Sequence, residues 1–112
     1  MIVTQNITQD LTRPIVQVVY SKVGDTNRKV AVTVKNSGVA WNVPAGATCV
    51  LYAKDNEGNY YTSNSVTFSG NVVTATLPAF SQRGTASTEI EISSGGQIVA
   101  TLGFYTEIYK SA

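Results

Sequence analysis

The sequence contains no histidine and only one cysteine among its 112 residues. Without histidine the chain lacks the usual general base at neutral pH, a common metal ligand and a member of most catalytic triads. A single cysteine forms no internal disulfide, and the lack of disulfides is weak evidence against secretion by the host cell's usual route. We interpret Cys49, which lies in a strand-like run, as a small buried apolar side chain rather than a reactive thiol.

Long apolar runs and concentrated charge are also missing. No apolar run approaches the ~20 residues that a membrane-spanning helix needs, so we expect no membrane insertion. Residues 1–6 have neither a basic segment nor a continuous apolar segment, so we expect no signal peptide. The formal net charge is +1 and the eight basic residues are scattered, whereas nucleic-acid binding needs a clustered basic face. We therefore expect no nucleic-acid partner.

The seven carboxylates form no recognisable catalytic cluster. Glu89 and Glu91 share a strand face, where we interpret them as solvated; paired acids for glycoside hydrolysis need a separation and orientation that sequence does not give. The polar segment 55–59 offers oxygen ligands for calcium without the spacing of an EF-hand loop, which favours a plain turn. We predict no catalytic residue, no metal site and no cofactor, and hence no enzyme. A hydrolase using serine and lysine is a distant alternative without a motif.

What the sequence does have is an alternation of apolar and polar residues along nearly every structured stretch. In the run 28–36, Val30, Val32 and Val34 fall on one face, and this period of two is typical of a strand with one wet face. We predict strands at about 15–22, 28–36, 39–43, 48–54, 60–62, 66–68, 72–77, 85–93 and 97–109. Seven to nine strands at this spacing predict an all-β sandwich or barrel. Parallel pairs would need helical crossovers, which the sequence does not supply, so we predict antiparallel sheets.

The chain has room for one domain, which we place at residues 15–112. The polar, threonine-rich segment 1–14 is either an N-terminal arm that docks on another subunit or an edge strand of the same domain. The edge strand is favoured. The spacing of Ile7, Leu11 and Ile15 also fits a helical turn.

Aromatic side chains are the remaining candidates for a sugar-stacking platform or a protein interface. The candidates are Trp41, Tyr52, Tyr60, Tyr61, Tyr105 and Tyr109. In a sandwich some of them must fill the core, and this interpretation is favoured for Trp41, which lies near the start of a strand. For the adjacent pair Tyr60 and Tyr61, alternation predicts that one ring faces inward and the other outward.

Several turns and strands resemble the N-terminal domain of phage baseplate upper proteins, a family found in siphophages and prophages of Gram-positive bacteria. The motifs that carry the resemblance lie at 18–28, 36–41, 54–58 and 98–108. The family-like turn consists of Gly24, Asp25, Asn27 and Arg28. The resemblance spans residues 15–109, and it departs from the family at Val23, where glutamine is common.

The resemblance implies an immunoglobulin-like antiparallel β-sandwich that plugs into the tail-tip baseplate and links a receptor-binding module to it. It implies other baseplate or tail proteins as partners, a homo-oligomer in the assembled virion, and a place in the virion tail after synthesis in the bacterial cytoplasm. The turn residues would be structural, with Arg28 able to pair with Asp25.

Longer members of the family carry a stalk and host-recognition parts after this domain. Since the chain stops at Ala112, we expect either a piece of such a protein or a minimal version whose task is assembly. The alternative hypothesis for function is a carbohydrate-binding or adhesin-like module that uses exposed tyrosines.

Overall fold

Ten β-strands and no helix make up the part of the chain that the structure, a computed structural model, describes, namely residues 3–13 and 15–110. That part accordingly contains no helix able to cross a membrane. The strands are β1 (Val3–Asp10), β2 (Val18–Lys22), β3 (Arg28–Asn36), β4 (Val39–Ala40), β5 (Thr48–Lys54), β6 (Tyr60–Ser63), β7 (Val66–Ser69), β8 (Val72–Thr76), β9 (Gly84–Ser94) and β10 (Gln97–Tyr109). The prediction of an all-β fold is confirmed.

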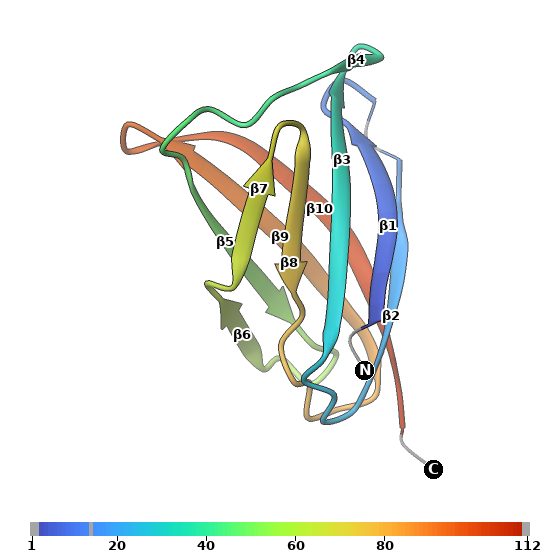
Figure 1. Cartoon of the computed structure of the whole chain (residues 1–112). Helices are drawn as coiled ribbons and strands as arrows, with labels where there is room; N and C mark the ends of the chain where they lie inside the picture. Colours follow the sequence, from blue (N-terminus) through green and yellow to red (C-terminus); the bar gives the residue numbers. More distant parts are fainter. Residues whose placement is uncertain (1–2, 14, 111–112) are drawn as a thin grey trace.

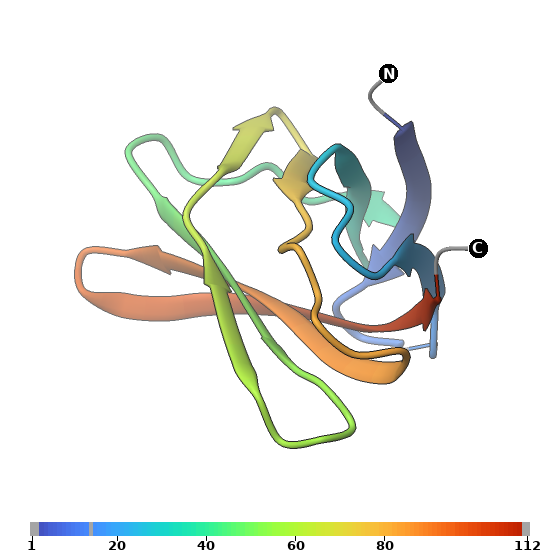
Figure 2. The ribbon, with the colours of Figure 1, turned by 90° about the horizontal axis from the view of Figure 1, so that it is seen from below.

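The strands form two five-stranded sheets that lie in two layers (Figures 1 and 2). Sheet A has the order β1-β3-β8-β7, with β4 paired to β3, and sheet B has the order β2-β10-β9-β5-β6. The inner faces of both sheets contribute to one hydrophobic core. This arrangement is compatible with the predicted sandwich.

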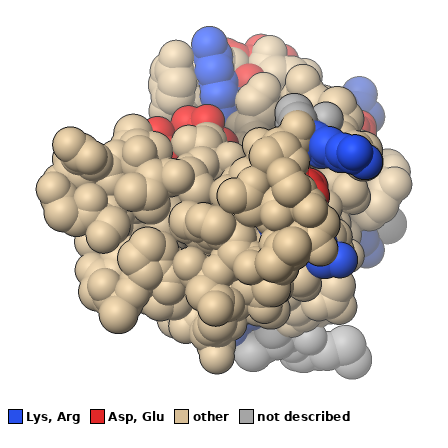
Figure 3. Space-filling view, turned by 90° about the horizontal axis from the view of Figure 1, so that it is seen from above, with Lys and Arg blue, Asp and Glu red and all other residues tan. Residues whose placement is uncertain are grey.

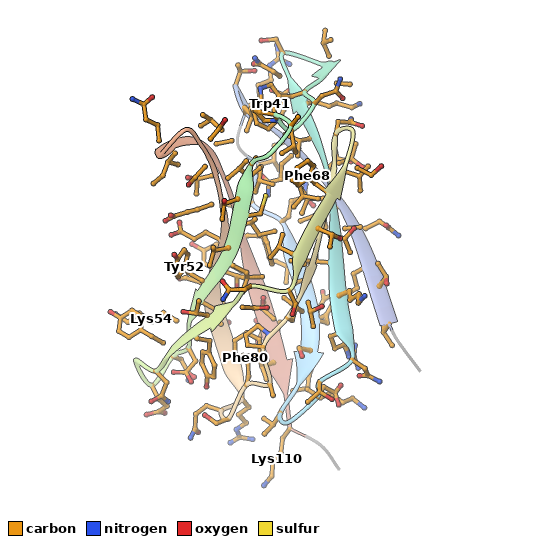
Figure 4. The ribbon with its side chains drawn as sticks, turned by 60° about the vertical axis from the view of Figure 1, so that its left-hand side comes forward. Trp41, Tyr52, Lys54, Phe68, Phe80 and Lys110 are labelled. Carbon is orange, nitrogen blue, oxygen red and sulfur yellow. The ribbon has the colours of Figure 1, made fainter. Side chains whose placement is uncertain are left out.

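Alternation along the strands explains the core. Every second residue in the middle of β3 is fully buried, and the same alternation on β5 buries Cys49, Leu51 and Ala53. Phe80, in the loop between β8 and β9, is also buried, and Figure 4 shows it between the two sheets near one end. Burying a side chain of this size stabilises the fold by roughly 1.5–3 kcal/mol.

The prediction of purely antiparallel sheets is wrong at one edge of each sheet. In sheet A, β1 runs parallel to β3, and in sheet B, β2 runs parallel to β10. A parallel pair needs a connection that returns the chain to the same end of the sheet, usually through a helix. Here a strand of the facing sheet makes the return, because the chain passes from β1 in sheet A through β2 in sheet B to β3 in sheet A.

The structure has one strand more than the nine predicted. This strand is β1, which lies within the segment 1–14, where the sequence allowed an arm, an edge strand or a helical turn. It pairs with β3 over eight residues as an edge strand of sheet A. The alternative prediction of a helical turn is wrong, because Ile7 lies within the strand and its neighbours on either side are exposed.

Two strands are three residues shorter than predicted. The strand expected at 15–22 begins only at Val18, which lies opposite Tyr105 of β10. The strand expected at 39–43 ends at Ala40, and the chain then crosses from sheet A to sheet B as an extended loop (Figure 1).

Candidate functional site

The outer face of sheet B, which points away from the core, carries all the exposed tyrosines. They are Tyr20 on β2, Tyr52 on β5, Tyr60 on β6, and Tyr105 and Tyr109 on β10. Alternation places them there, because neighbours such as Phe104 and Ile108 are buried. One face of the molecule therefore gathers aromatic rings from four strands.

A hollow of about 310 Å³, which we call the tyrosine groove, lies on this face. Its lining includes Tyr52, Lys54, Tyr60, Ser87, Glu89 and Gly103. A second hollow of about 300 Å³ lies between β10 and residues of the segment 9–16. Because both hollows are lined by Ser87 and Gly103, they adjoin at the middle of the face.

The strand register places one row of side chains across the groove. Tyr105 lies opposite Ser87, Ser87 opposite Lys54, and Lys54 opposite Tyr60. The ammonium nitrogen of Lys54 lies 5.2 Å from the centroid of the Tyr60 ring, which is within cation–π range. The row thus has a tyrosine at each end and a small serine between them.

The neighbouring row crosses the same three central strands. Gly103 lies opposite Glu89, and Glu89 lies opposite Tyr52. Figure 4 shows Tyr52 and Lys54 pointing away from the sandwich on the same side of β5. The groove is therefore walled by large side chains of β5 and β6, and its floor includes two small residues, Ser87 of β9 and Gly103 of β10.

Exposed apolar and aromatic side chains also line the edge strand β2. We define the β2-edge patch as Ile15, Val16, Val18, Tyr20, Tyr105 and Tyr109. Ile15 and Val16 are 68% and 72% exposed although both are apolar. The rings of Tyr20 and Tyr109 stack, with centroids 5.9 Å apart and planes at 19°. Contiguous exposed apolar patches of this kind mark interaction sites.

The tyrosine groove and the β2-edge patch each combine aromatic rings with a hollow or with apolar exposure. No protein-family model and no curated protein matches the sequence. Function is therefore inferred from these two surfaces and from the sequence resemblance. Charge adds little, because charged side chains lie scattered around a mostly uncharged surface at the end seen in Figure 3.

The aromatic candidates from the sequence do not meet at one site. Trp41 is half-buried and packs against the core, and Figure 4 shows it at the opposite end of the sandwich from Phe80. Tyr60 is 78% exposed, whereas the ring of Tyr61 packs against the core and meets Phe80 edge-on, with centroids 4.9 Å apart. The prediction that one ring of this pair faces inward and the other outward is confirmed.

The family-like turn joins segments that are distant in sequence. Arg28 Nε donates to Asp25 Oδ2 at 3.0 Å. Gly24 has a φ of 80°, a conformation that favours glycine, and its N–H donates to the carbonyl of Phe80 at 2.9 Å. The carbonyl of Asn27 accepts from the N–H of the first residue of β1 at 2.9 Å. These contacts are those of a structural turn.

Asp55 closes the polar turn that the sequence offered as a calcium candidate. Its carboxylate accepts hydrogen bonds from the N–H groups of Glu57 and Asn59, both at 2.9 Å, and from the Tyr61 hydroxyl at 2.8 Å. Burial by itself raises the pKa of Asp55, but the hydrogen bonds lower the pKa by a larger amount, so that it lies below the ordinary value. The carboxylate oxygens of Asp55 therefore accept hydrogen bonds within the turn itself. Within residues 3–13 and 15–110, no three His, Cys, Asp or Glu side chains are grouped to hold a metal ion.

Asp10 has a role that the sequence did not reveal. Its carboxylate accepts hydrogen bonds from the N–H groups of Ser37 (3.0 Å) and Gly38 (2.8 Å) and from the N–H and hydroxyl of Thr12. Ser37 and Gly38 have φ of 52° and 79° and form the two-residue turn between β3 and β4, in which both positions need positive φ. The hydrogen bonds, that from the Thr12 hydroxyl above all, lower the pKa of Asp10 far below its ordinary value.

Of the other residues singled out by the sequence, Cys49 and Glu91 lie in ordinary surroundings, whereas Glu89 lines the tyrosine groove. Cys49 is buried as predicted, and burial raises the pKa of its thiol, which keeps it protonated and unreactive at neutral pH. Glu89 and Glu91 are half-buried on the outer face of β9. Gly103 was missed, because nothing in the sequence says which residues lie across from it on β9 and β5.

Proposed function

We propose that this chain is a structural adaptor of a phage or prophage tail baseplate, which anchors a receptor-binding appendage to the tail tip by protein–protein association. The observation that carries the proposal is the β2-edge patch. The resemblance of residues 15–109 to the N-terminal domain of baseplate upper proteins supports it from the sequence. The two-layered architecture is compatible with the immunoglobulin-like sandwich that the resemblance implies.

The composition of the patch suits association with protein. Ile15, Val16 and Val18 offer apolar area, and the tyrosines offer large amphipathic rings of the kind enriched in interface hot spots. The patch follows the edge strand β2, where the backbone N–H and carbonyl of Tyr20 are already bonded to the Gln5 side chain of β1, so the proposed contact is made by side chains rather than by strand pairing.

The proposed mechanism is association alone. In a symmetric baseplate each copy contributes a modest buried area, and the multiplicity of copies makes the assembly stable. Partners are other tail proteins and further copies of the chain, and the place of action is the virion tail.

The experiment is co-expression with the proteins encoded by neighbouring genes, followed by size-exclusion chromatography with light scattering. We expect a complex of defined stoichiometry, or a defined homo-oligomer, that Ile15→Lys disrupts. Ile98→Lys is the matched control, because Ile98 is 60% exposed, like Ile15, but lies in the β9–β10 turn region outside the patch. A chain that remains monomeric with every neighbour, or a complex equally sensitive to both variants, would contradict the proposal.

A further inference from the structure

Gly103 lies in the longest strand, β10, where the backbone has no need of glycine. The other eight glycines have positive φ, whereas Gly103 does not. A Cβ atom placed on Gly103 would meet no atom within 4 Å. A strand-interior glycine weakens the strand and often marks a place where a ligand or another backbone approaches closely. The missing side chain leaves the floor of the tyrosine groove open.

The dimensions of the groove suit an extended ligand. Tyr105 and Tyr60, at the two ends of one row, are separated by three strand spacings of about 4.8 Å, or about 14 Å in all. The adjoining hollow continues past Gly103 toward the segment 9–16. A ligand made of several small rigid units in a chain can occupy both hollows, whereas one side chain inserted by a partner protein can occupy only one of them.

The chemistry of the lining combines apolar ring faces with hydrogen-bonding groups. Tyr52 and Tyr60 offer aromatic faces and phenolic hydroxyls, Ser87 offers a hydroxyl, and Glu89 and Lys54 offer an acceptor and donors. Sugar rings present the complementary pattern, with an apolar face of C–H groups and a rim of hydroxyls. We propose that the tyrosine groove binds a neutral saccharide chain.

Charge decides between saccharide classes. The groove contains one carboxylate and one ammonium group, Glu89 and Lys54, in adjacent rows of the lining. The adjoining hollow adds the carboxylate of Asp10, which already accepts four hydrogen bonds from neighbouring N–H and hydroxyl groups. A strongly acidic saccharide is attracted by the ammonium group but repelled by the carboxylate, and a strongly basic one is attracted by the carboxylate but repelled by the ammonium group. In each case the repulsion offsets the attraction. A neutral chain of hexose or N-acetylhexosamine units meets no such opposition. The lining of the tyrosine groove contains no residue of the β2-edge patch on which the adaptor role rests, and the two share only the adjoining hollow, which Ile15, Val16 and Tyr105 line.

The test is an array of neutral oligosaccharides built from hexose and N-acetylhexosamine units, followed by NMR titration of the best binder. The wild-type chain is expected to bind and to shift the backbone signals of β5, β9 and β10 around the groove. Gly103→Val fills the floor, and it should weaken binding at least about tenfold. Its unfolding midpoint should equal or exceed that of wild type, because valine favours strands and the site has room. Thr48→Val, on the same face outside the groove, is the matched control and should leave binding unchanged.

A second pair of variants separates the groove from tyrosines in general. Tyr52→Ala should weaken saccharide binding, whereas Tyr109→Ala, in the β2-edge patch, should not. The proposal is overturned if no array member binds, or if Gly103→Val binds as wild type does. It is also overturned if Gly103→Val abolishes association with a tail protein while no saccharide binds, because the groove would then be a protein site.

Discussion

At the scale of single residues, the hydroxyl of Ser21 is the clearest misfit. Ser21 faces inward from β2, is 1% exposed, and its hydroxyl is the one buried side-chain polar atom of the described residues without a hydrogen-bond partner. Such a group loses its water without compensation. We expect Ser21→Ala to raise the free energy of unfolding by about 1 kcal/mol, measured by urea denaturation.

Thr106 provides the control for Ser21. It is also fully buried, but its hydroxyl shares a 2.9 Å hydrogen bond with that of Thr88. Thr106→Val removes one partner of this bond and should therefore lower the free energy of unfolding by about 1 kcal/mol. If both variants change stability in the same direction, hydrogen-bond satisfaction is not what distinguishes the two sites.

At the scale of elements, Asp10 couples the end of β1 to the β3–β4 hairpin. All four groups that contact its carboxylate are hydrogen-bond donors. Asp10→Asn replaces one acceptor oxygen by a donor, so we expect a lower free energy of unfolding at pH 7. The N–H groups of Ser37 and Gly38 bind different carboxylate oxygens, and asparagine keeps only one, so hydrogen–deuterium exchange should rise first at whichever of the two residues loses its acceptor.

The effect of this variant should depend on pH. Because the pKa of Asp10 is lowered in the folded state, its contribution is fully present above the ordinary carboxyl pKa of about 3.9 and is lost as the pH falls toward the folded value. The stability difference between wild type and Asp10→Asn should therefore shrink as the pH is lowered below about 4. Glu57→Gln, in another turn, is the control. A difference that stays constant or grows in acid would contradict this account.

The elements that the sequence predicted well are those with local signals. The valines of β3 alternate, and a turn cluster ends the strand, so its bounds 28–36 agree with the structure. The parallel pairing of β1 with β3 could not be predicted in the same way. It depends on which sheet each edge strand joins, and neighbouring residues do not determine that choice.

The candidate sites were predictable only in part, for a related reason. Alternation predicted that one ring of the pair Tyr60 and Tyr61 faces inward and the other outward, because facing is a property of one strand; the structure shows that Tyr61 is the inward one. The groove depends on four strands at once: Gly103 of β10 becomes a floor only when Glu89 lies opposite it and the tyrosines of β5 and β6 lie beyond. The sequence shows that a glycine lies within a strand, but only the cross-strand register shows which side chains surround it.

At the scale of the whole molecule, the two sheets are joined through Phe80. Its loop leads from β8 in sheet A to β9 in sheet B. Its ring packs on Tyr61 of β6, and its carbonyl accepts from the N–H of Gly24 in the β2–β3 turn. One residue thus lies in the core that both sheets share, meets Tyr61 of sheet B and binds the turn between β2 and β3.

This position makes Phe80 a test of whether the sandwich unfolds as one unit. Phe80→Ala removes a fully buried ring and should lower the free energy of unfolding by about 3–5 kcal/mol. Phe68→Ala is the control, because Phe68 is half-buried on the edge strand β7, and it should cost about 1–2 kcal/mol. If Phe80 stabilises both sheets, circular dichroism and tyrosine fluorescence must lose their signals at the same urea concentration in this variant. Separate transitions would mean that the sheets melt independently, and equal losses in the two variants would mean that Phe80 supports only its own loop.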